Sequence, residues 1–159
     1  MEFADPAKPY SVRFVLLRHT LPEGGNRQSH WDLMFDSGDF LLTFALPSLP
    51  ETNSPTVVAG LSNASPPLQS LAVTRLPDHR LLYLEYEGPI APAVDTGDAA
   101  RGSVRQVAAG QALSTIDAEV GQMRCRLKSP QLCAEFRYTP CGIGEETQFE
   151  IYRWQWVTS

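Results

Sequence analysis

The sequence has few cysteines, and none of them lies in a metal-binding arrangement. Cys125, Cys133 and Cys141 are the only three, they are spaced eight residues apart, and no C-x-x-C pair occurs. An odd number of separated thiols predicts neither a disulfide framework nor a structural zinc site. The first residues also lack a basic region followed by an apolar stretch, so no secretory signal is predicted. We therefore expect unpaired thiols in a cytoplasmic protein.

Long apolar runs and lysine are scarce as well. FLLTFAL at 40–46 is among the longest apolar runs, far short of the roughly 20 residues that cross a membrane, so no membrane association is expected. Only two of the 13 basic residues are lysines, and the net charge is −5. An acidic chain of this kind does not coat nucleic acid non-specifically, although a local arginine site remains compatible with it.

What the sequence does contain is a series of short segments rich in β-forming residues. In GQMRCRLK (121–128), for example, apolar side chains alternate with basic ones. Only QALSTIDAEV (111–120) favours a helical turn or two. Many short strands with little helix predict an all-β, mainly antiparallel protein, either a barrel or a sandwich. The predicted strands are 11–19, 30–35, 40–46, 70–76, 81–88, 121–128, 132–138 and 148–157.

The segments between these strands define the domain organisation. Asp36-Ser37-Gly38-Asp39 has the composition of a hairpin turn. Residues 47–69 are rich in proline and serine, and 88–102 are rich in glycine, proline and aspartate, so both are predicted loops. Because the chain before residue 47 is too short for its own core, we expect one domain over 1–159.

The three histidines mark the candidate site. His19 ends one predicted strand, and His30 opens the next in the sequence SHWDLMFD. Alternation in a strand places His30, Asp32 and Met34 on one side. If the two strands are neighbours, His19 lies beside the His30–Asp32 pair, giving a donor set that suits Mn²⁺, Fe²⁺ or Zn²⁺.

Two other interpretations of these residues stay open. A single H-x-D pair is more often a solvated or hydrogen-bonded pair than a metal site. The triad of His30, Asp32 and the distant His79 is also typical of iron/2-oxoglutarate oxygenases. In that class a basic residue follows the distal histidine by about one strand, and here the next basic residue after Arg80 is Arg101.

Three stretches resemble a known family, the 3′-phosphoesterase domain of bacterial DNA ligase D and its small free-standing relatives. They are RFVLLRHT (13–20), SHWDLMFDSGDFLLTFALP (29–47) and SLAVTRLPDHRLLYLEYEG (70–88). The specific feature is the combination of R-H, then H-x-D-L, then D-H-x-x-x-Y-x-x-x-E-G. The resemblance implies a compact β-barrel with long loops that binds Mn²⁺, or another divalent metal such as Zn²⁺, and processes 3′ ends in DNA repair.

The resemblance also implies roles for individual residues. His19, His30 and Asp32 fall on the family's metal ligands, His79 on the histidine that acts on the phosphate, and Tyr83 on the tyrosine four residues beyond it. The implied partners are nucleic-acid 3′ ends carrying a phosphate or a terminal ribonucleotide, together with DNA ligase or end-joining proteins.

Two positions depart from the family pattern. Met34 stands where the family usually has an arginine two residues after the metal-binding aspartate, and Ser70 replaces a second basic residue. Arginine–phosphate contacts are strong charge-assisted bonds. Their loss opens an alternative, in which the chain is a catalytically weak or inactive module that binds nucleic-acid ends or repair proteins. Arg75, Arg80 and Arg18 are the candidates to compensate.

Overall fold

The computed structural model describes residues 9–22, 28–51, 66–90 and 101–157. Nearly all regular structure in this part of the chain is β-strand, with one short 3-10 helix, η1 (Leu81–Leu84). No helix among the described residues is long and apolar enough to cross a membrane. The strands are β1 (Tyr10–Thr20), β2 (His30–Asp36), β3 (Leu41–Leu46), β4 (Gln69–His79), β5 (Gly88–Pro89), β6 (Ser103–Asp117), β7 (Gln122–Lys128), β8 (Leu132–Tyr138) and β9 (Glu146–Trp156).

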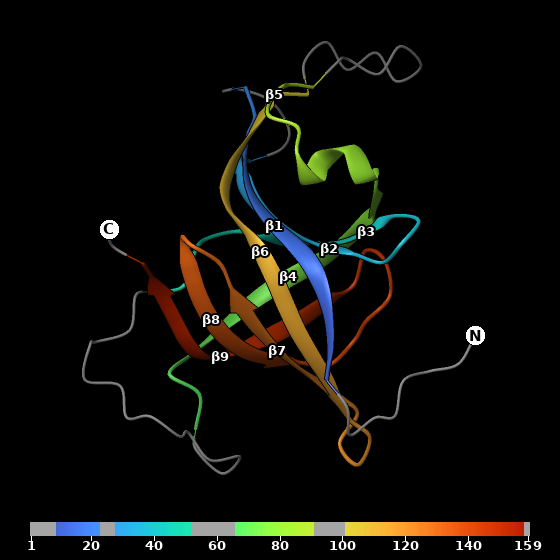
Figure 1. Ribbon diagram of the computed structural model, residues 1–159, viewed down its shortest axis with the longest axis vertical. Coiled ribbons are helices and arrows are strands. Elements are labelled where there is room, and N and C mark those ends of the chain that lie inside the picture. The colour runs from blue at the N-terminus through green and yellow to red at the C-terminus, as the bar shows by residue number, and fades with distance from the viewer. Residues whose placement is uncertain (1–8, 23–27, 52–65, 91–100, 158–159) are drawn as a thin grey trace.

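Eight of these strands form a closed antiparallel barrel. Neighbours follow the order β1-β2-β3-β4-β9-β8-β7-β6, and β6 returns to pair with β1 along its length. Figure 1 shows β1 and β6 side by side at this closure, with the two-residue β5 beyond it. The expectation of an all-β, mainly antiparallel barrel is therefore confirmed.

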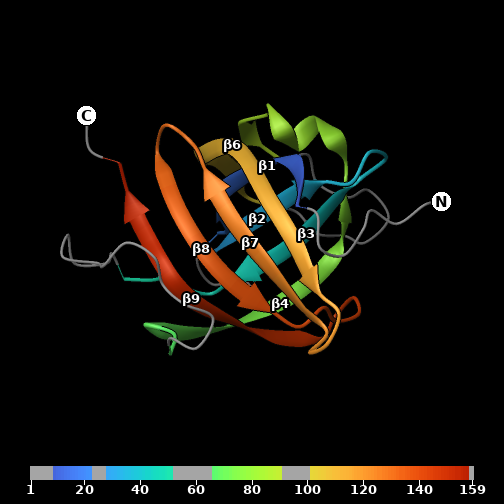
Figure 2. The same cartoon turned by 60° about the horizontal axis from the view of Figure 1, so that its bottom comes forward.

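The barrel interior is filled by every second side chain of each strand. Phe14 and Leu16 of β1 and Leu33 and Phe35 of β2 point inward, as period-two alternation requires. Figure 2 shows β6, β7, β8 and β9 side by side in front, with β1, β2 and β3 on the other side of this core. At its centre lie four aromatic rings with centroids 4.5–6.0 Å apart, those of Phe44, Phe136, Tyr138 and Phe149.

A second, smaller apolar cluster lies on the outside of the barrel. The outward side chains of Val15, Leu17, Met34 and Leu41 pack with Val104 of β6 and are covered by Leu84 of η1. Burying these side chains removes apolar surface from water at about 25 cal/mol per Å², so η1 is held against the outer face of β1, β2 and β3. We call this group the outer cluster.

Several local expectations are confirmed. The turn after β2 is a hairpin in which the Ser37 amide donates to Phe40 O at 2.9 Å and the Gly38 amide to Asp36 Oδ1 at 2.8 Å. Gly38 has a φ of 99° there, which favours glycine. In β7 the apolar side chains Cys125 and Leu127 are buried, and the basic ones between and after them are exposed.

The predicted strand over 81–88 is wrong. β4 ends at His79, and the chain turns into η1, where the Tyr83 amide donates to Arg80 O and the Glu85 amide to Leu82 O, both at 3.1 Å. The run of leucine and tyrosine has β propensity, but packing overrides it, because a helical turn sets Leu84 into the outer cluster. His79, Leu81, Tyr83 and Glu85 therefore do not share a strand face.

The expected helical turn over 111–120 is also wrong. β6 continues to Asp117, pairing with β1 on one side and β7 on the other. Over residues 111–114 neighbouring strands pair with its backbone on both sides, which a helix in this position would forfeit.

The predicted loops fit in part. β4 begins at Gln69, and the described residues 47–51 and 66–68 precede it without forming a strand. Gly88–Pro89 forms β5, contrary to the prediction of a loop there, since its backbone pairs with the start of β6. Residues 52–65 and 91–100 of the two predicted loops lie outside the described residues.

Candidate metal centre

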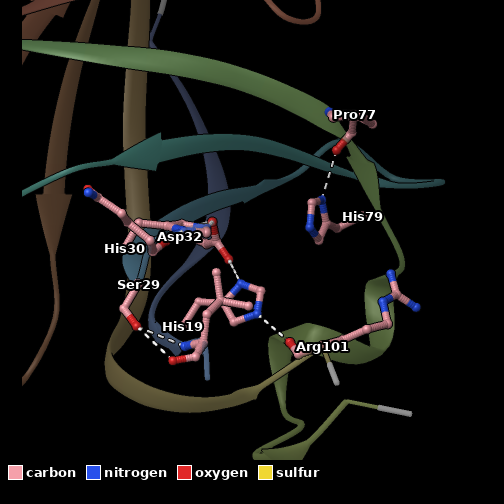
Figure 3. Close-up of polar contacts among 9 residues, drawn as sticks. His19, Ser29, His30, Asp32, Pro77, His79 and Arg101 are labelled. Carbon is pink, nitrogen blue, oxygen red and sulfur yellow. Dashed lines mark hydrogen bonds and ion pairs between the residues drawn. The ribbon is translucent and has the colours of Figure 1, made fainter. Parts of the chain in front are cut away.

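Two histidines and one aspartate meet on the outer face of the barrel where β1 ends and β2 begins. His19 lies directly opposite His30 in the register of these strands, and Asp32 follows two residues later on the same face. The ligand atoms of the three side chains all lie within 4.8 Å of one another. The structure thus brings together the three residues that the sequence indicated as ligands (Figure 3).

The Asp32 carboxylate lies between the two rings. His19 Nδ1 is 3.3 Å from Asp32 Oδ2, and His30 Nε2 is 3.0 Å from Asp32 Oδ1. Two ligands bound at about 2.1 Å to one ion, at an angle between a right angle and the tetrahedral angle, lie about 3.0 to 3.4 Å apart. The two measured separations are compatible with side chains that share a metal ion, and 3.0 Å is also an ordinary hydrogen-bond length.

The outer nitrogen of each ring contacts a backbone carbonyl. His19 Nε2 is 2.9 Å from Arg101 O, and His30 Nδ1 is 3.0 Å from Gln28 O. Since a carbonyl oxygen only accepts, each of these nitrogens carries the proton and donates it. In the neutral rings the remaining nitrogen, the one facing Asp32, then carries a lone pair.

These tautomers make the cluster unfavourable when it is neutral and empty of cations. Two lone pairs would face a carboxylate that is only 2% exposed, so three acceptors would meet without a proton among them. Two arrangements relieve this: protonation of both rings, or a divalent cation bound among the three side chains. Metal-bound histidines commonly donate their other ring proton to a backbone carbonyl, as both rings do here.

The pKa of Asp32 reflects the first of these arrangements, in which both rings are protonated. Burial raises the pKa of the Asp32 carboxyl, but hydrogen bonds from the protonated His19 and His30 rings and the charges on them together outweigh it, lowering the pKa to about 2. The carboxylate is thus ionised throughout the neutral range, as a metal ligand must be.

His79 and Tyr83 lie together but outside the ligand group. His79 ends β4, and its Nδ1 donates to Pro77 O at 2.8 Å, leaving Nε2 for another partner. Its ring centroid is 6.0 Å from that of Tyr83 in an edge-to-face arrangement. In Figure 3 His79 stands on the same side of the sheet as the ligand group, with Arg101 below it. The alternative triad of His30, Asp32 and His79 is not assembled, because His19 takes the third place.

The two positions that depart from the family pattern hold no cation. Met34 is 1% exposed within the outer cluster, and the exposed Ser70 donates its hydroxyl proton to Gln148 Oε1 at 3.0 Å. Arg75 does not compensate, since its Nη1 donates to Cys141 O at 2.8 Å and so holds the turn between β8 and β9. Arg80 is exposed and precedes η1.

Sequence reasoning missed the groups that orient the ligands. The carbonyls of Gln28 and Arg101 fix the two rings, and Ser29 braces the chain after β1 by accepting from the Leu21 amide at 2.8 Å (Figure 3). Any residue type supplies a carbonyl, so the sequence carries no signal for it. Gly102 lies next to Arg101 and has a φ of +77°, a conformation that favours glycine.

The fold and this cluster define the chain as a closed antiparallel barrel with a buried two-histidine, one-carboxylate group on its outer face. No protein-family model matches the chain, and no curated protein matches it significantly.

Proposed function

We propose that His19, His30 and Asp32 bind a divalent metal ion and that the protein is a metal-dependent phosphoesterase acting on nucleic-acid 3′ ends. One observation carries the metal site. Both imidazoles donate their outer proton to a carbonyl and aim the other nitrogen at the same buried carboxylate. A bound cation would account for two imidazole lone pairs that face one carboxylate.

The donor set indicates the class of metal. Two imidazoles and one carboxylate suit Mn²⁺, Fe²⁺ and Zn²⁺, and the carboxylate favours the harder ions. We propose Mn²⁺, with Zn²⁺ as the next choice, in agreement with the resemblance to the 3′-phosphoesterase domain of DNA ligase D.

The reaction would cleave a terminal phosphate ester with water, giving a 3′-hydroxyl and inorganic phosphate. The bound ion would supply positive charge to the phosphate oxygens and orient the attack on phosphorus. His79 Nε2 would donate a proton to the leaving oxygen or hydrogen-bond the charge that develops on it. Tyr83 lies edge-to-face against the His79 ring and would position it or the phosphate.

Metal content is the first test. After purification without chelators and loading with Mn²⁺, wild type should hold one ion per chain by elemental analysis, and His30→Ala should hold none. His79→Ala is the matched control, since it removes an imidazole outside the ligand group and should retain the ion. Equal metal content in wild type and His30→Ala would end the proposal.

Turnover is the second test. A 3′-phosphorylated primer–template, and one ending in a ribonucleotide, would be incubated with the protein in Mn²⁺ and in EDTA. Wild type should release product only with Mn²⁺, and His79→Ala should keep its metal yet lose about 100-fold or more in rate, the range of general acid–base catalysis. Metal-loaded wild type that leaves both ends intact would contradict catalysis.

A second function is favoured by one observation. The Met34 side chain occupies the family's arginine position inside the outer cluster, so no cation can approach phosphate there. This second candidate is a binding module, which recognises 3′ ends or docks onto a DNA ligase or end-joining protein in the cytoplasm. It would keep the metal site but would not catalyse hydrolysis. It predicts end-dependent affinity that survives His79→Ala, with no product from either form.

A further inference from the structure

Two arginines and a tryptophan lie on one rung of the barrel, next to the candidate metal centre. Arg105 of β6, Arg18 of β1 and Trp31 of β2 are direct neighbours in the register of these three strands. The next rung towards the strand ends consists of Val104, His19 and His30.

Alternation places the two rungs on opposite faces of the sheet. Leu17 of β1 and Val104 of β6 belong to the outer cluster, whereas Leu16 of β1 fills the interior. Arg18, Arg105 and Trp31 therefore point towards the mouth of the barrel, and Trp31 packs against the inner core. Arg18 is thus not placed at the phosphate that the metal centre would hold.

The Arg18 side chain is fixed but incompletely satisfied. Its guanidinium carbon lies 4.0 Å from the centroid of the Trp31 ring, an attractive cation–π contact. Its Nη1 is buried and has no hydrogen-bond partner. Buried donors almost always have a partner, so a bound group or a water molecule would complete this one.

Arg105 places a second positive charge on the same rung, directly opposite Arg18 in the strand register. Like charges directly opposite one another on paired strands are destabilising, and no acidic side chain among the described residues forms an ion pair with either arginine. Arg105 is exposed, so it extends the charge from the half-buried Arg18 to solvent. An anion between the two guanidinium groups would relieve the repulsion and satisfy the orphan donor.

We propose that Arg18 and Arg105 bind an internal phosphate of a nucleic-acid strand, with Trp31 holding Arg18 in place. The choice of a nucleic-acid strand rests on the proposed function, while the anion site rests on its own contacts. A strand whose 3′ end lies at His19 and His30 on the outer face would cross the rim of the barrel and meet this rung next. Planar guanidinium groups suit phosphate oxygens.

The test measures the affinity of the full chain for a short fluorescein-labelled single strand ending in a 3′-phosphate, in EDTA, over a series of salt concentrations. EDTA removes the metal contribution and prevents turnover. The variants are Arg18→Gln, Arg105→Gln and Trp31→Leu. Arg126→Gln removes the same charge from the exposed outer face of β7 and is the matched control. Inorganic phosphate serves as the competitor.

Wild type should bind the strand, and each arginine substitution should reduce the slope of log affinity against log salt by about 0.7, as expected for one lost phosphate contact. Arg18→Gln should weaken binding about tenfold, from the loss of a charge-assisted hydrogen bond. Trp31→Leu should weaken it less, because the charge remains. Arg126→Gln should change neither quantity.

Three results would overturn the inference: wild type that does not bind the strand, unchanged slopes in Arg18→Gln and Arg105→Gln, or displacement of the strand by an equal concentration of inorganic phosphate. The exposed Arg105 keeps the test decisive if Arg18→Gln fails to fold. Reduced slopes without product in the turnover assay would support this site and reject catalysis, so the two proposals fail separately.

Discussion

Among single residues, Asp32 is the one whose carboxylate contacts both histidines of the candidate metal centre. Its folded-state pKa is lowered to about 2 from an ordinary value of 3.8, so the unfolded chain binds more protons than the native one between these values. The free energy of unfolding of the metal-free protein should therefore be fully supported by Asp32 above about pH 4 and lose that support as the pH falls towards 2.

This linkage can be measured with Asp32→Asn. For the metal-free wild type, urea unfolding between pH 5 and pH 2 should lose on the order of 2 kcal/mol more than Asp32→Asn does. Asp39→Asn, which changes an exposed carboxylate in the hairpin after β2, is the control and should behave as wild type. Parallel pH profiles for wild type and Asp32→Asn would contradict the ionised, clamped carboxylate.

Met34 allows a second prediction at this scale. Met34→Arg restores the residue type of the related family but forces a charge among Val15, Leu17 and Leu41. We expect the free energy of unfolding to fall by about 3 kcal/mol or more, with no gain in phosphoesterase activity. Ser70→Arg, at an exposed position, should change stability by less than about 0.5 kcal/mol. A stable Met34→Arg with faster turnover would contradict the packing argument.

At the scale of elements, the start of β6 positions the site. A Cβ on Gly102 would lie 2.0 Å from Thr20 O, so the chain of β6 approaches β1 closely beside Arg101, whose carbonyl orients His19. Gly102→Ala should push this carbonyl away and weaken metal binding about tenfold or more, as titration calorimetry with Mn²⁺ would show.

Gly121→Ala is the matched control for this change. Gly121 also has a positive φ, of +67°, but a Cβ there meets nothing within 4 Å. Gly121→Ala should lower the free energy of unfolding by only about 1 to 2 kcal/mol, the cost of placing an alanine in a left-handed conformation. It should leave metal affinity unchanged. Equal metal affinity in the two variants would mean that the Arg101 carbonyl does not set the His19 ring.

The elements also show how far sequence can predict this protein. β1 and β2 were predictable because they are continuous runs of β-forming apolar residues. β7 was predictable because buried apolar residues alternate with basic ones. β6 was not, since its inward residues Ala108 and Ala112 and the glycine between them carry little apolar signal. η1 was missed because Leu84 packs against segments distant in the sequence.

The functional residues, too, were predictable from the sequence only in part. The His30–Asp32 spacing follows from alternation, and His19 joins it once β1 and β2 are neighbours. The Arg18–Arg105 pair depends on the β1–β6 register and on the shift between Leu16 and Leu17, which no local pattern specifies.

At the scale of the whole molecule, Cys125 reports on the integrity of the barrel. It is 2% exposed inside the core, and burial raises the pKa of its thiol to about 12, opposed by a weaker hydrogen bond from Ser114. Cys133 and Cys141 are half-buried near the surface. We expect a thiol reagent at pH 8 to label Cys133 and Cys141 in the native protein, and Cys125 only when the barrel unfolds.

Mass spectrometry of the labelled chain checks this directly. The rate of Cys125 labelling should increase with urea in parallel with global unfolding monitored by circular dichroism. Rapid labelling of all three thiols in buffer would mean that the strands around Cys125 open without unfolding.

The pairing of β1 with β6 has a consequence for how other proteins can engage this one. Within the described residues each of the eight barrel strands has a neighbouring strand on both sides, and β5 adds only two residues outside the ring. Sheets with free edges recruit partners, or aggregate, by adding a foreign strand. Because the ring is closed, we expect a protein that associates with this barrel to recognise mainly side chains and loops, and the native state offers little template for fibril growth.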